Sequence, residues 1–217
     1  MLRRRAAYLV PICLAWALIW PAEPARAAEI SPLVTLAALA PPAGPARLLR
    51  KWSGALERHA SALAAPACTP GPGCVTPAWQ RLLARLARAP RAVQLHGVNL
   101  FVNAAPYVPD ETNWGESDYW ESPEELFARG GDCEDYAIAK YLSLRALGLR
   151  AAELRLVVLR ERASGEAHAV LLVRIDGATL VLDNLTSELL PWDALAERYQ
   201  PIYSVNEDAA WIHSGPG

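Results

Sequence analysis

The hydrophobic pattern changes period at Gly148, and this change restricts the chain to folds with helices first and strands after. Before Gly148, apolar residues recur at the spacing of amphipathic helices. After it, short runs rich in leucine and valine are separated by the turn dipeptides Ser164-Gly165 and Asp176-Gly177, which predict three consecutive antiparallel strands. The predicted helices cover residues 47–63, 79–89, 90–103, 122–126, 133–147 and 192–199, and the predicted strands cover 154–159, 167–173, 178–183 and 201–205. We therefore expect an α+β fold, with N-terminal helices followed by an antiparallel sheet.

The segment between the third and fourth predicted helices, residues 104–122, is too rich in Pro, Asp, Asn and Gly for a long element. Its aromatic residues, Trp114, Tyr119 and Trp120, either pack over the core or line a substrate cleft. Asp110 and Glu111 are expected to be ordinary loop acids. We expect this loop to lie beside the helix that starts near residue 133.

The first 27 residues have the pattern of a secretory signal peptide. Three arginines precede an apolar run, and Ala25-Arg26-Ala27 gives the small-x-small cleavage pattern. Export from the cytoplasm is therefore expected, while a retained membrane anchor is less favoured because the run is short and contains Pro11. The remainder divides into an N-terminal lead-in and helical part, 28–90, and a larger C-terminal part, 91–217, which is the expected core of the protein.

The charge balance argues against nucleic acid as a partner. The chain has 21 basic and 23 acidic residues, and the predicted signal peptide holds four of the arginines but one acid, so the mature part is more acidic still. No basic stripe interleaved with aromatic residues is present, which excludes the usual nucleic-acid-binding pattern.

Cysteine count gives the first indication of chemistry. Loss of Cys13 with the signal peptide leaves three cysteines, an odd number for an oxidising compartment. Cys68 and Cys74 flank the turn-forming Thr-Pro-Gly-Pro-Gly loop, so we expect them to form a disulfide; a metal role for this pair lacks further ligands nearby. Cys133 is left unpaired, and is therefore either an inert buried thiol or a reactive one.

Cys133 lies where Gly130-Gly131 gives way to a helical pattern, with Asp132 as the expected N-cap. A helix start favours a thiolate, because the unpaired N–H groups and the helix dipole stabilise negative charge. The adjacent carboxylates Asp132, Glu134 and Asp135 act in the opposite direction. This conflict needs a physical resolution.

A nucleophilic cysteine needs a base and a group that orients the base. His168 stands at the start of the second predicted strand and Asp183 at the end of the third. The tight Asp176-Gly177 turn makes these strands antiparallel neighbours, so the two side chains are expected to meet across them. The alternatives are a satisfied core histidine and a turn aspartate. His59, His96 and His213 lie outside this set and are expected to be solvent-facing or structural.

Four ordered motifs resemble the bacterial transglutaminase-like cysteine peptidases, the LapG-like adhesin proteases. They are WGESDYW at 114–120, GDCEDYA at 131–137, HAVL at 168–171 and VLDN at 181–184, and the resemblance runs from about Trp79 to Trp211. It implies a papain-like, transglutaminase-like fold. It further implies that Cys133 is the nucleophile, His168 the general base and then acid, and Asp183 the residue that orients the imidazole.

The resemblance also offers a resolution of the acidic setting, because members of this family depend on calcium. A hard divalent cation bound by the oxygens of Asp132, Glu134 and Asp135 would cancel their charge. Six or more oxygens are needed, and the loop at 113–118 is one source of the rest. Without the resemblance, acids in the first turn of a helix read as dipole-complementing residues and Asp132 as a simple N-cap.

The function implied by the resemblance is that of a periplasmic, calcium-dependent cysteine endopeptidase. Its expected substrate is a large cell-surface adhesin, cleaved near its N-terminal retention module with release of the biofilm. The expected regulator is an inner-membrane cyclic di-GMP receptor of the LapD type. Two alternatives remain at the level of sequence: a transglutaminase-type acyltransferase with the same triad, and a non-catalytic periplasmic binding protein.

Overall fold

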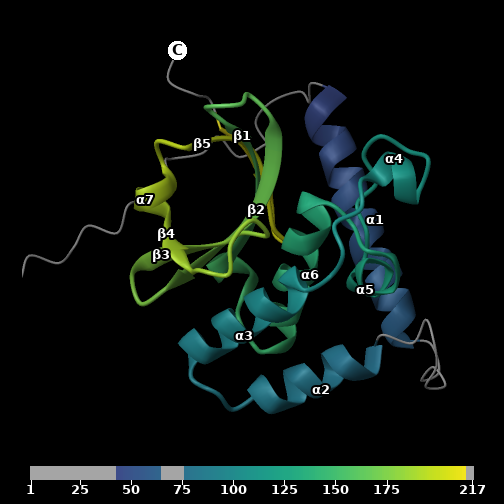
Figure 1. The fold of residues 1–217 in the computed structure, drawn as a ribbon, viewed down its shortest axis with the longest axis vertical. Coiled ribbons are helices and arrows are strands. Elements are labelled where there is room, and N and C mark those ends of the chain that lie inside the picture. The colour runs from purple at the N-terminus through teal and green to yellow at the C-terminus, as the bar shows by residue number, and fades with distance from the viewer. Residues whose placement is uncertain (1–42, 65–75, 214–217) are drawn as a thin grey trace, which may run out of the picture.

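The computed structural model describes residues 43–64 and 76–213. The predicted signal peptide and the predicted Cys68–Cys74 disulfide lie outside these residues. Within them, no helix is long and apolar enough to cross a membrane. The architecture is the predicted α+β arrangement, with helices followed by an antiparallel sheet (Figure 1).

The helices follow the predicted segments with small shifts at their ends. The helix predicted at 122–126 extends to Arg129. The helix predicted at 192–199 ends at Leu195, and Tyr199 belongs to the next strand. A one-turn helix inside the predicted 104–122 loop and a short 3-10 turn were not expected from periodicity, since neither is long enough to show one. The helical elements are α1 (Ala43–Ala64), α2 (Thr76–Leu86), α3 (Arg91–Asn103), α4 (Asp110–Asn113), α5 (Pro123–Arg129), α6 (Cys133–Ala146), η2 (Ala151–Glu153) and α7 (Trp192–Leu195).

Six strands form one sheet in the order β4-β3-β2-β1-β5-β6, and every neighbouring pair is antiparallel. The predicted hairpins are confirmed: β2 pairs with β1 on one side and with β3 on the other. Asp176 and Gly177 both have positive φ, 48° and 82°, as the tight β2–β3 turn requires. The strands are β1 (Leu154–Glu161), β2 (Ala167–Ile175), β3 (Ala178–Leu182), β4 (Leu190–Pro191), β5 (Tyr199–Val205) and β6 (Ala210–Ile212), of which β4 and β6 are too short to have been predicted.

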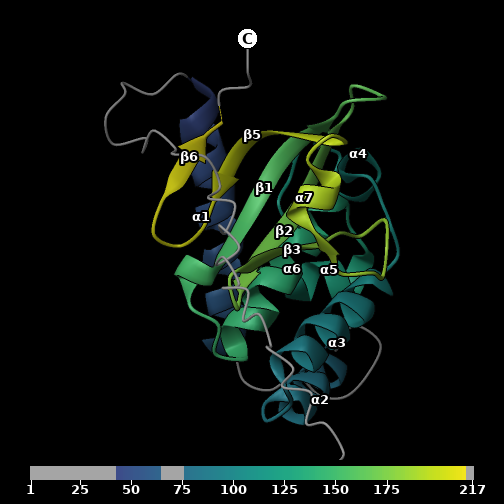
Figure 2. The same cartoon turned by 90° about the vertical axis from the view of Figure 1, so that its left-hand side faces the viewer.

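Helix α6 is the centre of the molecule. The sequence predicts one broad buried stripe on it, but every residue from 135 to 144 is buried. The reason is that α6 packs against β1 and β2 on one side and against α3 and α5 on others, as the two views in Figures 1 and 2 show. Arg145, at the end of this buried stretch, pairs with Glu207 at 2.9 Å. Residues of β2 alternate between the main core (Leu171, Val173) and a smaller cluster on the other face (Val170, Leu172).

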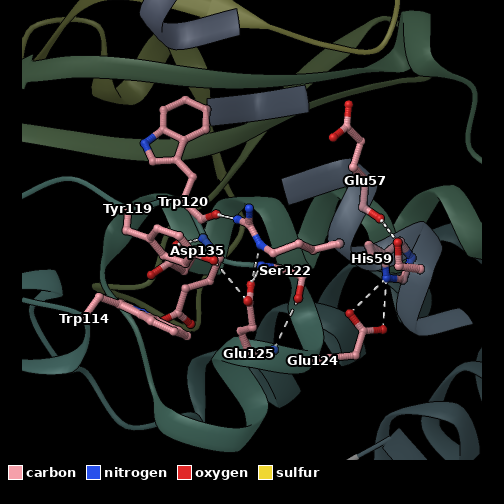
Figure 3. Close-up of polar contacts among 12 residues, drawn as sticks. Glu57, His59, Trp114, Tyr119, Trp120, Ser122, Glu124, Glu125 and Asp135 are labelled. Atoms are coloured by element: carbon pink, nitrogen blue, oxygen red, sulfur yellow. Dashed lines mark hydrogen bonds and ion pairs between the residues drawn. The ribbon is translucent and has the colours of Figure 1, made fainter. Parts of the chain in front are cut away.

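Helix α1 packs on the core and holds α5 in place. Trp52 is buried and its ring meets that of Tyr141 on α6 edge to face, at 5.0 Å between centroids. About two helical turns further on, His59 Nδ1 lies 3.0 Å from Glu124 and Arg58 Nε lies 3.0 Å from Glu125, both on α5 (Figure 3). Ser122 caps α5 with a full capping box. These contacts fix the loop that precedes α5 relative to α6.

Candidate active site and cation site

Cys133 is the first residue of α6, and a closely packed glycine pair directs the chain into it. Gly130 has φ 83°, and a Cβ there would come within 2.5 Å of the Pro106 carbonyl oxygen. The 106–108 backbone lies directly against this turn: the Val108 N–H donates to Gly131 O at 2.9 Å and the Gly131 N–H donates to Pro106 O at 3.2 Å. Only glycine allows this approach, and the result is a thiol at a fixed helix start.

His168 and Asp183 meet in a direct hydrogen bond, with 2.9 Å between His168 Nε2 and Asp183 Oδ1. They are not directly opposite each other; the β2–β3 register places Asp183 one diagonal step from His168, on the same face. Asp183 is buried, and burial opposes its ionised form. The hydrogen bond and charge of His168, together with hydrogen bonds from the Leu185 backbone N–H and the Tyr199 hydroxyl, outweigh that penalty and hold the pKa of Asp183 below its ordinary value.

A cavity of about 520 Å³ brings Cys133 and His168 to one surface. A second cavity of about 180 Å³, on the side of Leu185 and Glu166, is also lined by both residues. Because His168 Nε2 is engaged by Asp183, Nδ1 is the ring nitrogen outside that bond. Trp120 is buried in the core and also lines the larger cavity, so it serves both as a core residue and as part of the cavity wall. Trp114 and Tyr119 stack on each other at 4.5 Å between centroids.

The acidic neighbours disfavour a thiolate. Burial raises the pKa of Cys133, and the charges of Glu134 and Asp132 raise it further. The thiol of Cys133 donates a hydrogen bond to Glu134 Oε2 at 3.1 Å. The conflict seen in the sequence is therefore present in the folded protein, unless the charge of these carboxylates is cancelled.

Five carboxylates gather beside Cys133 in a way that suits a hard cation. Oxygens of Asp110, Asp132 and Asp135 lie within 4.8 Å of one another, and so do oxygens of Asp110, Asp118 and Glu134. Oδ1 of Asp110 and Oδ1 of Asp132 are buried and have no hydrogen-bond partner among residues 43–64 and 76–213. Lys51 of α1 forms an ion pair with Asp118 at the edge of this cluster. An all-oxygen donor set with buried, unsatisfied oxygens fits calcium.

Burial and mutual repulsion disfavour the ionised forms of these carboxyl groups. Burial, followed by the charge of Glu134, raises the pKa of Asp132 to about 8, and burial raises that of Asp110 to about 6. Burial also raises the pKa values of Glu134 and Asp135. Asp135 differs from the others, since its two oxygens already accept the backbone N–H groups of Glu121, at 2.8 Å, and Asp132, at 2.9 Å.

Sequence reasoning missed three of these residues. Asp110, expected to be an ordinary loop acid like Glu111, is buried at the centre of the cluster, whereas Glu111 is exposed. For Asp118, the sequence predicts only that the loop at 113–118 supplies further calcium ligands, and it does not single out this residue. Tyr199, placed by its sequence in a helix, donates to Asp183 Oδ2 from β5 at 2.7 Å. No local pattern marks any of the three, because each acts through a contact distant in sequence.

The remaining histidines have no place in this site. His59 pairs with Glu124 as described, and His96 is exposed. His213 lies 2.9 Å from Ser204 Oγ, and burial, followed by the charge of Arg155, lowers its pKa to about 4. His59 and His213 are thus structural.

Known proteins resemble this chain in sequence and in fold. The sequence model described as "Bacterial transglutaminase-like cysteine proteinase BTLCP" matches residues 74–216. No curated protein sequence matches the chain.

Solved structures of LapG from Legionella pneumophila resemble the chain in fold and sequence. One has 34% identity and a TM-score of 0.60, over 66% of this chain and 80% of the LapG chain. Its calcium-bound form has 31% identity and a TM-score of 0.60, over 76% of this chain and 89% of the LapG chain. An EGTA-treated form has 34% identity and a TM-score of 0.60, over 68% and 81%.

Proposed function

The chain belongs to the bacterial transglutaminase-like cysteine proteinases, and we propose that it is an endopeptidase with Cys133 as nucleophile, His168 as base and Asp183 as the residue that orients the base. One observation supports these roles above all. His168 Nε2 is bonded to buried Asp183 at 2.9 Å, and the same histidine lines a cavity with Cys133. A histidine held in this way has one tautomer and one orientation.

The reaction follows from these positions. Nδ1 of His168 takes the thiol proton, and the sulfur attacks the substrate carbonyl carbon to form a C–S bond. The backbone N–H of Cys133, at the start of α6, is the expected donor to the oxyanion. His168 then gives its proton to the leaving amine as the C–N bond breaks, which leaves a thioester. Water, deprotonated by His168, attacks the thioester, and the acid and the free thiol are released.

We further propose that calcium binds to the oxygens of Asp110, Asp118, Asp132 and Glu134, with Asp135 holding the backbone around them. The unsatisfied buried oxygens of Asp110 and Asp132 support this, as does the calcium-bound form of the LapG relative. When bound, the ion would cancel the negative charge beside Cys133 and so favour the thiolate. Glu134 would then no longer compete for the thiol proton.

For the substrate we propose a large surface adhesin, cleaved in its N-terminal region so that a biofilm detaches. The similarity to LapG and the four sequence motifs support this proposal. The signal-peptide pattern of residues 1–27 supports a periplasmic location. An inner-membrane cyclic di-GMP receptor is the proposed regulator on the same grounds.

The proposed function is tested by cleavage of an N-terminal fragment of an adhesin encoded near this protein's gene. The wild type should cleave it with calcium, stop in EGTA, and recover when calcium is restored. Cys133→Ala should remove cleavage with the fold intact, while Glu111→Gln, which alters the exposed acid next to Asp110, should leave both cleavage and calcium dependence unchanged.

Two outcomes would contradict the proposal. Cleavage by Cys133→Ala would rule out the nucleophile, and full activity in EGTA would rule out the calcium requirement. A primary amine added to the reaction separates hydrolysis from acyl transfer, because amine incorporation in excess of cleavage identifies a transglutaminase.

A further inference from the structure

Asp183 is placed beyond the end of its strand, so the sheet alone does not fix it. Strand β3 ends at Leu182, and the β2–β3 backbone pairing ends at the Leu171–Leu182 pair. Yet Asp183 is only 2% exposed. Its position depends instead on side chains from two elements that are not neighbours of β3 in the sheet.

The first of these side chains is Tyr199 on β5, which acts on the carboxylate. Its hydroxyl donates to Asp183 Oδ2 at 2.7 Å, and its ring lies against that of His168 at 5.8 Å between centroids. Strands β2 and β1 lie between β3 and β5 in the sheet order. Tyr199 therefore contacts both His168 and Asp183 from across the sheet, and its bond to Oδ2 leaves Oδ1 of Asp183 to the imidazole and the Leu185 backbone N–H.

The second set comes from α3 and acts on the backbone around Asp183. Asn103 Nδ2 donates to Asp183 O at 2.9 Å and to Thr186 O at 3.0 Å. Asn99, one helical turn earlier and fully buried, donates to the carbonyls of Thr186 and Ser187, both at 3.2 Å. Two asparagines on one face of a helix thus fasten the loop that carries Asp183.

We propose that Tyr199 and Asn103 are positioning residues of the catalytic site, which act on Cys133 through Asp183 and His168. The proposal rests on the triad roles given above. Tyr199 fixes the orientation of the Asp183 carboxylate, and Asn103 fixes the position of the Asp183 main chain. Each contact restricts one movement by which Asp183 could turn away from His168. A buried hydrogen bond to a charged carboxylate is among the stronger side-chain contacts, so its loss should be felt in reactivity and not only in stability.

The test compares matched variants by the rate at which iodoacetamide alkylates Cys133 at neutral pH in calcium, read by mass spectrometry of the Cys133 peptide. Tyr199→Phe removes only the hydroxyl and should slow alkylation about tenfold. Tyr141→Phe removes the hydroxyl of a buried tyrosine whose partner is Glu207 N, and should stay within about twofold of the wild type. Equal rates for the two variants would overturn the role of Tyr199.

The asparagine has its own control on the same helix. Asn103→Ala should slow alkylation, whereas Gln94→Ala, which removes the bond from Gln94 Nε2 to Leu86 O at 2.9 Å, should not. If Tyr199→Phe fails to fold, the comparison of Asn103→Ala with Gln94→Ala still tests whether residues that hold Asp183 control the reactivity of Cys133. Equal slowing by Asn103→Ala and Gln94→Ala would show a general effect of loosening α3 and would overturn the role of Asn103.

A double-mutant comparison separates positioning from stability. In an Asp183→Asn background, Tyr199→Phe should cause no further slowing, because the residue through which Tyr199 acts is already lost. If the fold-reductions in alkylation rate caused by Asp183→Asn and Tyr199→Phe multiply in the double variant, the proposal is contradicted. Failure of the triad itself gives a different result: wild-type Cys133 would then react no faster than a free thiol, whatever stands at residue 199.

Discussion

At the scale of single residues, the site depends on how buried charges are satisfied. Asp183 is ionised because three donors surround it: His168, the hydroxyl of Tyr199 and the backbone N–H of Leu185. Beside Cys133, the part of the chain that the structure describes supplies no comparable donors for Asp110 Oδ1 and Asp132 Oδ1. Aspartate is thus stabilised as an anion on one side of the cavity, whereas on the other side its ionised form would be stabilised by the calcium ion that we propose.

Lys140 is another buried titratable residue, and its burial leads us to predict that the stability of the protein depends on pH. It is 1% exposed on α6, and burial lowers its pKa to about 7, with the charge of Asp183 acting in the opposite direction. The ordinary lysine pKa is 10.5, so the unfolded chain binds more protons between these two values and stability should rise with pH across that window.

Lys140→Met should therefore stabilise the protein by about 1–3 kcal/mol below pH 7, and by progressively less as the pH approaches 10.5. Urea unfolding at a series of pH values measures this. Arg81→Met, at an exposed position of α2, is the matched control and should show no such trend. If Lys140→Met stabilises the protein equally at every pH, the stabilisation does not come from removing the buried lysine charge.

At the scale of elements, α1 belongs to the structural core although it precedes the residues matched by the family model, 74–216. Its buried face packs on α6 through Trp52, and its polar residues hold α5 and the loop that supplies Asp118. The helix is therefore expected to be necessary for the site as well as for stability.

Trp52→Ala tests this role. Loss of a buried tryptophan side chain should cost about 3–5 kcal/mol in the free energy of unfolding. Leu63→Ala, on the same helix but 59% exposed, should cost less than about 0.5 kcal/mol. Urea unfolding of the two variants decides between a packed helix and a peripheral one, and equal costs would contradict the packing described.

Elements with a strong local pattern were predictable, and those without one were not. The turns at Gly165 and Gly177 and the apolar runs on either side of them predicted β1, β2 and β3, and with them the meeting of His168 and Asp183. Strands β4 and β6 have two and three residues, too few for an alternating pattern to appear. Tyr199 was assigned to a helix because Pro191 and Trp192 start one, and pairing with β1 ends it early.

At the scale of the whole molecule, the proposed cation site joins parts of the chain that are distant in sequence. Asp110 starts α4, Asp118 lies in the loop before α5, Glu134 lies on α6, and Lys51 of α1 pairs with Asp118. This is why the sequence showed only the acids adjacent to Cys133: the others come near them only in the folded chain.

Because the site ties these elements together, calcium should stabilise the whole fold. A ligand at about 100 times its dissociation constant adds about 2.7 kcal/mol, enough to raise Tm by several degrees. Differential scanning fluorimetry of the EGTA-treated protein with and without calcium measures the shift. It should vanish in Asp132→Asn/Glu134→Gln and persist in Glu111→Gln; a shift that survives in the double variant would place the ion elsewhere.

The most direct test of the central claim is to trap the thioester. Wild-type protein mixed with the adhesin fragment in calcium, quenched in acid and digested, should yield a Cys133 peptide that carries the N-terminal cleavage product, as measured by mass spectrometry. His168→Ala should give neither this adduct nor cleavage. Cleavage that proceeds with no acyl group on Cys133 at any quench time, and that survives in Cys133→Ala, would contradict the account.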